Sequence, residues 1–235
     1  MLRSLRTAWK VFCYGVGFAL VAALAVQAWY YAHVLWWRSY EPAASAFMEA
    51  RIVRLREKDP KAKLIHQWMP YERISEQLKR AVVAAEDAKF VDHEGFDWQA
   101  ISKAIEKNER KGKVVAGAST ISQQLAKNLF LLGERSWLRK GQEAVITWML
   151  ESSLSKRRIL ELYLNYAEWG EGVFGAEAAA RYHFGTNAAS LSAQQAAFLA
   201  VILPSPRRYA PGRVTPYIAG RIATILARMP AAQIP

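Results

Sequence analysis

The most extended feature of the hydrophobic pattern is an uncharged run near the N-terminus. Residues 11–37 contain no charged side chain, and only Gln27 and His33 among them are strongly polar. As an α-helix rising 1.5 Å per residue, this run would be about 40 Å long, more than the roughly 30 Å hydrocarbon thickness of a bilayer. Basic residues precede the run, and tryptophan and tyrosine crowd its far end. This pattern predicts a membrane anchor with its N-terminus inside and the following chain outside.

A cleaved signal peptide and a buried core helix are the alternative interpretations of this run. A small-residue cleavage site is present at residues 23–25, but the apolar run continues past it and is too long for a typical signal sequence. A core helix seldom stays uncharged over such a length. We therefore expect residues 1–10 to form a cytoplasmic basic tail and residues 11–37 an uncleaved single-pass transmembrane anchor.

Beyond the anchor, the pattern is helical for most of the chain. Residues 38–62 predict a juxtamembrane segment, helical as far as Asp59, and residues 63–70 (KLIHQWMP) are the only plausible extended stretch. From Ser75 onward, apolar residues recur at i, i+3, i+4 and i+7, which indicates one amphipathic helix after another. Capping residues, glycine and proline divide the pattern. The expected helix starts and stops are Ser75, Asp97, Gly112, Thr120, Leu138, Leu154, Ser155, Leu164, Ala176, Gly185, Ser192, Pro204 and Thr215. The fold class predicted is mainly α.

Charge and cysteine usage restrict the function. The chain carries a formal net charge of +12. A basic domain tethered beside a bilayer suggests anionic lipid headgroups or a phosphate-bearing substrate. Nucleic acid is the usual alternative partner for such a charge, and the export-type anchor argues against it. The only cysteine, Cys13, lies inside the predicted span, so no disulfide can form within the chain.

An acidic cluster interrupts this basic chain in the stretch AAEDAKFVDHEGFDW. Glu86 and Asp87 come at the end of the helix that opens at Ser75, where the helix dipole disfavours carboxylates. A broken local rule of this kind points to function, and a solvated helix end is the alternative. The other histidines show no ligand spacing to His93 of the following loop, so no metal site is expected.

A second polar constellation lies in the stretch GASTISQQLAKN. Gln123, Gln124, Lys127 and Asn128 fall near one face of the helix predicted there. Amides and a lysine suit sugar hydroxyls, N-acetyl groups and phosphate oxygens. From the residues alone, a solvated helix face is the favoured interpretation, and a binding role is the alternative.

A third constellation is the pair Arg139 and Glu143, which are one helical turn apart. If the pair is exposed, it is a structural ion pair that stabilises the helix by about 0.3–0.5 kcal/mol. If it is buried in a cleft, it places a carboxylate beside a phosphate-binding guanidinium.

Taken together, these stretches resemble the peptidoglycan glycosyltransferases. AAEDAKFVDHEGFD, GASTISQQLAKN, RKGQEA, SKRRILELYLN and AEWGEGVFGAEAAARYHFG occur in the order and spacing of that family, and the resemblance covers about residues 45–211. With one anchor and no transpeptidase domain, the chain resembles the monofunctional biosynthetic branch. The resemblance implies a lysozyme-like helical glycosyltransferase domain over residues 63–235, on the periplasmic side of a bacterial inner membrane. Its implied activity is the polymerisation of lipid II into glycan strands, with β-1,4 bonds formed by inversion and undecaprenyl pyrophosphate released.

The resemblance also implies roles for single residues. The family's catalytic glutamate corresponds to Glu86, which would act as general base on the 4-hydroxyl of the acceptor's N-acetylglucosamine. The second glutamate corresponds to Glu143, near the donor pyrophosphate. The positions that match the family's substrate-binding residues are Asp87, Ser119, Thr120, Gln123, Gln124, Lys127, Asn128, Arg135 and Arg139. Among these, the cationic ones would stabilise the leaving pyrophosphate.

The implied partners are lipid II, the growing glycan chain and membrane lipids, with cell-wall synthesis or division proteins as further candidates and no nucleic acid. No obligatory cofactor is implied, although a divalent cation (Mg²⁺ or Mn²⁺) bridges the pyrophosphate in some relatives. A membrane-bound lytic enzyme and a non-catalytic cell-wall scaffold are the alternatives. A lytic enzyme needs a protonated general acid at the scissile oxygen and has no pyrophosphate to hold, so the cationic residues favour the transferase.

Overall fold

The long apolar helix expected at the N-terminus is present. The computed structural model describes residues 2–113, 115, 117–133, 136–209, 211 and 213–235, with side chains from Trp9 onward. The chain forms two compact units, Met1–Glu41 and Pro42–Pro235. The first unit holds α1 (Leu2–Trp36), in which Trp9–Trp36 is long and apolar enough to cross a membrane, with a mean hydropathy of 2.0. Because α1 begins at Leu2, the basic residues expected as a tail continue the same helix.

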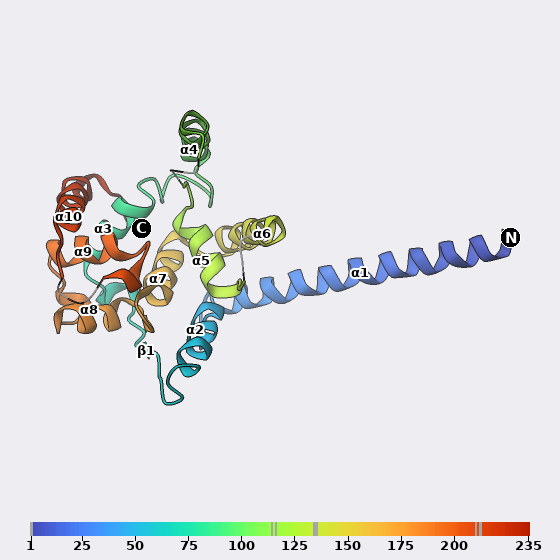
Figure 1. The fold of residues 1–235 in the computed structure, drawn as a ribbon, viewed down its shortest axis with the longest axis horizontal. Coiled ribbons are helices and arrows are strands. Elements are labelled where there is room, and N and C mark those ends of the chain that lie inside the picture. The colour runs from blue at the N-terminus through green and yellow to red at the C-terminus, as the bar shows by residue number, and fades with distance from the viewer. Residues whose placement is uncertain (1, 114, 116, 134–135, 210, 212) are drawn as a thin grey trace. The chain divides into compact units, whose positions relative to one another are not determined.

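The second unit is mainly helical, as predicted (Figure 1). Its helices are α2 (Ala46–Arg56), α3 (Glu76–Glu86), α4 (Trp98–Lys111), α5 (Ile121–Phe130), α6 (Trp137–Ser153), α7 (Lys156–Tyr166), α8 (Ala176–Phe184), α9 (Ala193–Ile202) and α10 (Pro216–Arg228). Its strands are β1 (Ile65–His66), β2 (Glu168–Gly170) and β3 (Val173–Phe174). Short 3₁₀ turns are η1 (Tyr71–Arg73), η2 (Ala188–Ser190), η3 (Pro206–Arg208) and η4 (Met229–Ala231).

The helix ends follow the capping chemistry of the sequence. Thr120 and Ser192 each form the reciprocal capping box, in which the side chain at the third helical position bonds back to the cap residue. Gly112 and Gly185 adopt left-handed conformations and end α4 and α8. Side-chain caps also open α3, α4, α6, α7 and α10, at Ser75, Asp97, Ser136, Ser155 and Thr215.

The small sheet is only partly predicted by the sequence. β1 lies inside the stretch 63–70 that reads as extended, but the hairpin of β2 and β3 falls where the pattern indicates helix after helix, and there the prediction is wrong. The strand order is β1-β3-β2, with β1 parallel and β2 antiparallel to β3. Strands of two or three residues are too short for an alternating pattern, and the hairpin turns at Gly172, whose φ is +72°.

The helices of the second unit form two packed groups. Helices α3, α9 and α10 pack against one another, and α5 packs against α2, α6 and α7 (Figure 1). The core beneath them is aromatic, with Tyr163, Tyr166 and Trp169 almost completely buried. Helix α2, in the predicted juxtamembrane segment, therefore belongs to the second unit and helps to position α5.

Candidate active site

Glu86, the expected catalytic base, is the last residue of α3 and is half-buried. Its Oε2 accepts a hydrogen bond of 2.8 Å from Nε2 of Gln124 on α5. The Oε1 of the same amide accepts a hydrogen bond of 2.9 Å from the hydroxyl of Tyr163 on α7. The carboxylate at the end of α3 is thus held by groups from two further helices.

The environment of Glu86 suits a base that works near neutral pH. Burial raises the pKa of the Glu86 carboxyl above its ordinary value. The Gln124 hydrogen bond and the positive charges of Lys127 and Arg221 partly oppose this shift, and the negative charge of Asp87 adds to it. A base with a raised pKa binds a proton more strongly, which helps it to deprotonate a hydroxyl.

Asp87 is buried and connects three backbone segments. Its Oδ2 accepts a hydrogen bond of 3.0 Å from the backbone N–H of Ile121, the first residue of α5, where helical N–H groups lack partners. Its Oδ1 lies 2.9 Å from Nε2 of His93. The Gly95 N–H donates to Nδ1 of His93, so Nε2 carries the proton that faces Asp87. Asp87 therefore fastens the loop after Glu86 to the start of α5.

Residues at the start of α5 cap the helix, and some of them also line a cavity. The Thr120 hydroxyl donates to the Gly95 carbonyl at 2.7 Å, and the Gln123 Oε1 accepts from the Thr120 N–H at 3.0 Å. Ser119, Gln123 and Gln124 line a cavity beside the helix. The loop that follows Glu86 is consequently tied to α5 at both Asp87 and Gly95.

Three adjoining cavities surround Lys127, which lines all of them. The α5–α6 cavity of about 540 Å³ is lined by Gly117, Ser119, Gln123, Gln124, Lys127, Ser136, Trp137, Arg139, Lys140 and Glu143. The α5–η3 cavity of about 390 Å³ includes Gln124, Lys127, Asn128, Tyr163, Arg207 and Arg208. A third cavity of about 350 Å³ extends between Lys127, Arg139 and α2. Glu86 itself lines none of the three cavities, but it is bonded to Gln124, which lines the first two.

The α5–α6 cavity holds a buried acid among cations. The Glu143 side chain is 5% exposed, and it pairs with Lys140 and, at 3.5 Å, with Arg139 Nη1. Arg139 is itself largely buried, so the pair matches the cleft interpretation and not that of an exposed helix pair. With Lys127 added, cations outnumber acids in this cavity, which suits a phosphate-bearing ligand.

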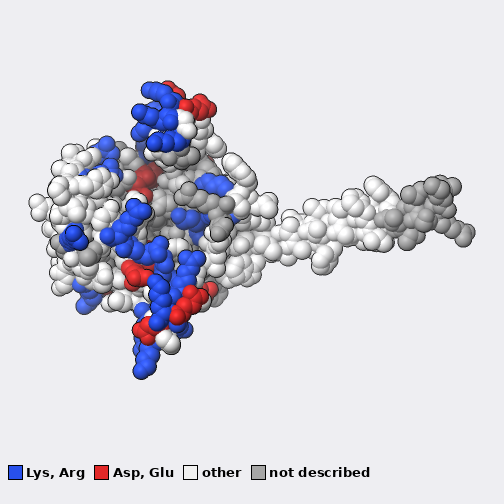
Figure 2. Space-filling model, in the orientation of Figure 1, with Lys and Arg blue, Asp and Glu red and all other residues white. Residues whose placement is uncertain are grey.

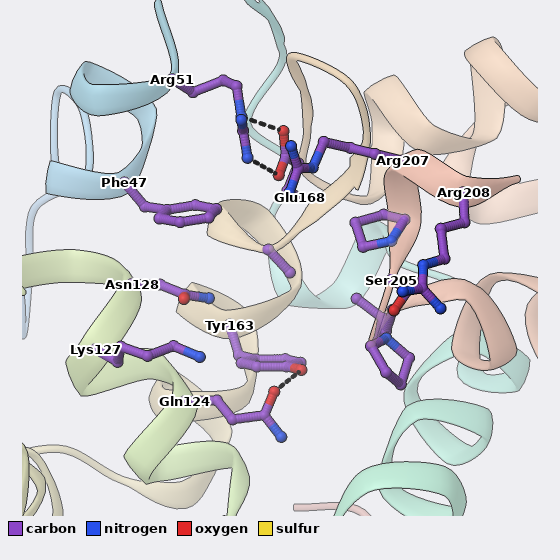
Figure 3. A pocket seen from close by; sticks show the side chains of 14 residues that line it. Phe47, Arg51, Gln124, Lys127, Asn128, Tyr163, Glu168, Ser205, Arg207 and Arg208 are labelled. Atoms are coloured by element: carbon purple, nitrogen blue, oxygen red, sulfur yellow. Dashed lines mark hydrogen bonds and ion pairs between the residues drawn. The ribbon is translucent and has the colours of Figure 1, made fainter. Parts of the chain in front are cut away.

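The α5–η3 cavity is also cationic (Figure 3). Arg51 and Glu168 neutralise one another through contacts of 2.7 and 2.8 Å, so Lys127, Arg207 and Arg208 supply the excess charge. Figure 2 shows Lys and Arg side chains around the hollowed middle of this face of the second unit, with acidic side chains among them.

Tyr163, Arg207 and Arg208 had no role predicted from the sequence. The adjacent arginines that follow two prolines were a usable signal, because a proline-rich turn with two charges is exposed. Tyr163 falls on the apolar face of α7 and is indistinguishable there from an ordinary core residue.

Two further expectations concern the leaving group and its cation. Arg135 lies outside the described residues. Within the described part of the chain, no group of three or more His, Cys, Asp or Glu residues could hold a metal ion. Glu143, the acid of the α5–α6 cavity, already pairs with Lys140 and Arg139. A divalent cation at the donor pyrophosphate would need only one or two protein carboxylates besides the phosphate oxygens, so that cation stays a prediction.

Comparison with known proteins agrees with this geometry. A family model described as transglycosylase matches residues 54–230. The biosynthetic peptidoglycan transglycosylase of Dechloromonas aromatica is 58% identical over 212 residues, which cover 90% of this chain and 92% of that relative. Proteins of the same name from Methylobacillus flagellatus (96% of this chain, 99% of the relative) and Herminiimonas arsenicoxydans (92% and 94%) are each 55% identical. The mainly helical second unit has the lysozyme-like fold of this domain. The chain therefore belongs to the family of peptidoglycan transglycosylases, and it is a glycosyltransferase.

Proposed function

We propose that the protein polymerises lipid II into peptidoglycan glycan strands, with Glu86 as the catalytic base. The observation that carries this proposal is a half-buried carboxylate that accepts a hydrogen bond from Gln124, a residue that lines two cationic cavities. A reaction that joins two pyrophosphate-linked sugars requires this combination of one base and two anion-binding pockets.

In the proposed reaction, Glu86 takes the proton of the 4-hydroxyl of the acceptor's N-acetylglucosamine. The hydroxyl oxygen then attacks C1 of the donor's N-acetylmuramic acid from the face opposite the leaving group. A β-1,4 glycosidic bond forms, the bond from C1 to the pyrophosphate oxygen breaks, and undecaprenyl pyrophosphate departs with the electron pair. Because the attack and the departure occur on opposite faces, the configuration at C1 inverts.

The donor's pyrophosphate fits the α5–α6 cavity. Lys127 and Arg139 line it, and Glu143 holds Arg139 and Lys140 beside it. Negative charge on the pyrophosphate grows as the bond to C1 breaks, and fixed cations in a partly closed cavity stabilise that charge in the transition state. Ser119 and Gln123 offer polar groups for the sugar hydroxyls.

The acceptor fits the α5–η3 cavity. Gln124 and Asn128 line its wall on α5, and Arg207 and Arg208 supply charge from the far side (Figure 3). Lys127 stands between the two cavities and would contact the donor in one and the acceptor in the other. In this arrangement the acceptor hydroxyl reaches Glu86 from one side and C1 of the donor from the other.

The membrane placement is part of the proposal. Helix α1 would cross a bacterial inner membrane once, with its basic N-terminus in the cytoplasm and the second unit on the periplasmic side. Lipid II and the lipid-linked glycan chain lie in the same bilayer, so an anchored enzyme keeps its reactive unit near both substrates.

A lytic enzyme that cleaves glycan strands is the competing function. It requires a protonated general acid. The Gln124 amide donates to Glu86, which suits the ionised carboxylate, and the two cationic cavities have no counterpart in the hydrolysis of an uncharged glycan.

The test is polymerisation of purified lipid II in detergent by the wild type and the Glu86→Gln variant, with the products resolved by length. We expect muramidase-sensitive chains from the wild type, and lipid II binding without extension from Glu86→Gln, since the amide keeps the size of the side chain and loses the basic oxygen. Asp92→Asn, at an exposed acid of the same loop, is the matched control and should polymerise normally. Shortening of preformed glycan with lipid II left intact would instead establish the lytic function.

A further inference from the structure

A chain of two hydrogen bonds leads from Glu86 into the protein interior. Gln124 Nε2 donates to Glu86 at 2.8 Å, and the Tyr163 hydroxyl donates to Gln124 Oε1 at 2.9 Å. Figure 3 shows the second of these bonds, with the amide of Gln124 on α5 beside the hydroxyl of Tyr163 on α7. The three side chains come from three different helices, so the chain of bonds depends on the packing of α3, α5 and α7.

The orientation of the Gln124 amide decides whether a hydrogen-bond donor or an acceptor faces the Glu86 carboxylate. An amide has two ends of nearly equal size, and only its partners determine which end faces which group. An ionised carboxylate accepts hydrogen bonds and cannot donate them. The NH₂ end of Gln124 must therefore face Glu86 when Glu86 is a base, and the Oε1 end must then find a donor on the other side.

The Tyr163 hydroxyl supplies that donor, and its buried position leaves it few other hydrogen-bond partners. Tyr163 is 1% exposed, and Gln124 Oε1 is the only acceptor of its hydroxyl among the residues that the structure describes. If the amide rotated, its NH₂ would face the phenol oxygen and the buried O–H would lose its acceptor, which is costly. Burial, and then the negative charges of Glu86 and Asp87, raise the pKa of Tyr163 well above its ordinary value, so the hydroxyl keeps its proton.

We propose that Tyr163 is a positioning residue for the catalytic base, because its hydroxyl fixes the Gln124 amide with the NH₂ end toward Glu86. This inference rests on the proposed function for the role of Glu86 as a base. Tyr163 acts through Gln124 and takes no proton from the substrate.

Removal of the hydroxyl should change the protonation of Glu86. Without the Tyr163 donor, the Gln124 amide can present either end to the carboxylate. An amide oxygen facing Glu86 favours its protonated form, so the pKa of Glu86 rises further. The ionised fraction then falls at a given pH, and the rate falls with it.

The first test compares Tyr163→Phe with wild type in the full-length protein, measuring lipid II polymerisation over a range of pH. We expect kcat to fall about tenfold, the size of one lost hydrogen bond to a buried polar group, with KM nearly unchanged. The acidic limb of the kcat profile should move to higher pH. Tyr166→Phe is the matched control, because it removes another buried hydroxyl from α7, one that bonds to the Pro42 carbonyl, and it should change neither quantity.

A double-mutant cycle separates positioning from a structural role. In a Gln124→Ala background, Tyr163→Phe should cause no further loss, since the residue through which it acts is gone. Equal losses in the two backgrounds, or an unchanged acidic limb in Tyr163→Phe, would overturn the proposal.

Titration of the Glu86 carboxyl provides a readout that needs no activity. In protein labelled with ¹³C at glutamate side-chain carboxyls, the Glu86 signal is identified by its absence from Glu86→Gln. Its pKa should be higher in Tyr163→Phe than in wild type, and an unchanged pKa would contradict the inference. If the pKa shifts but the wild type does not polymerise lipid II, the proposed function fails and the positioning of Glu86 by Tyr163 stands.

Discussion

At the scale of single residues, the burial of Glu86, the proposed catalytic base, has a cost in stability. Its pKa is raised in the folded protein, chiefly by burial, so the folded state holds the proton more strongly than the unfolded chain does. Its contribution to stability is therefore fully present below the unfolded pKa and is lost as the pH rises through the folded pKa. The proposed role requires an ionised Glu86 near neutral pH, and the burial that raises its pKa works against that ionisation.

Glu86→Gln should for this reason be more stable than wild type at neutral pH. The amide has no charge to bury, so the difference in unfolding temperature should shrink as the pH falls and vanish once Glu86 is protonated. Thermal unfolding followed by circular dichroism between about pH 4 and pH 8 measures this. Glu94→Gln, at an exposed acid of the same loop, serves as the control for removal of one charge. A gain in stability that does not depend on pH would rule out ionisation as its cause.

The residue scale also shows where sequence reasoning stops. Glu86, Gln124 and Lys127 could be singled out from the sequence because they break local expectations or share a helix face, and their roles stay predictions. Whether Arg139 and Glu143 are exposed or buried could not be predicted, since burial depends on cavity walls that come from several elements. The bond from Tyr163 to Gln124 joins two helices, and no local pattern carries it.

At the scale of elements, helix caps could be predicted from the sequence, whereas the pairing of strands could not. The caps at Thr120 and Ser192 were foreseen because each depends on residues three positions apart. The hairpin of β2 and β3 was missed because its strands are only three and two residues long, too short for an alternating pattern, and the pairing of β3 with β1 joins segments far apart in the sequence. The loop from Asp87 to Gly95 is neither a helix cap nor a strand pair. It is held by hydrogen bonds to α5 that the sequence does not reveal.

Gly95 is the position where that loop is least tolerant of change. Its φ is +89°, and an added Cβ would lie 2.8 Å from Thr147 Cγ2 and 3.0 Å from Glu151 Cγ. Gly95→Ala should therefore lose about 1–3 kcal/mol of stability from backbone strain and more from the clash. Activity should fall too, because the Gly95 backbone holds His93 and Thr120.

The matched control is Gly112→Ala at the end of α4. Gly112 also has a positive φ, of +61°, but an added Cβ there meets no atom within 4 Å. Gly112→Ala should therefore lose stability from backbone strain alone and leave polymerisation unchanged. Chemical denaturation of both variants separates the two effects, and equal losses of stability would show that the clash at Gly95 is relieved by movement of its neighbours.

At the scale of the whole molecule, charge and hydropathy are divided between the two units. Trp9–Trp36 carries an apolar surface suited to a bilayer, and the second unit carries the cationic cavities and the core. Because of this division, the average charge and hydropathy of the whole chain describe neither unit well. The sequence could be interpreted only after the uncharged run was set aside.

A chain that begins at Pro42 should accordingly keep its fold and lose its hold on membranes. The second unit contains its own core, with Tyr163, Tyr166 and Trp169 almost completely buried, so its helical circular dichroism and unfolding temperature should stay close to those of the full chain. With lipid II dissolved in detergent, its polymerisation rate should be nearly unchanged. With lipid II in vesicles, both co-sedimentation and the rate should fall strongly, because the burial of apolar surface by α1 is gone. Undiminished co-sedimentation would instead show that exposed side chains of the second unit, such as Trp137 and Trp148, suffice to hold it on the bilayer.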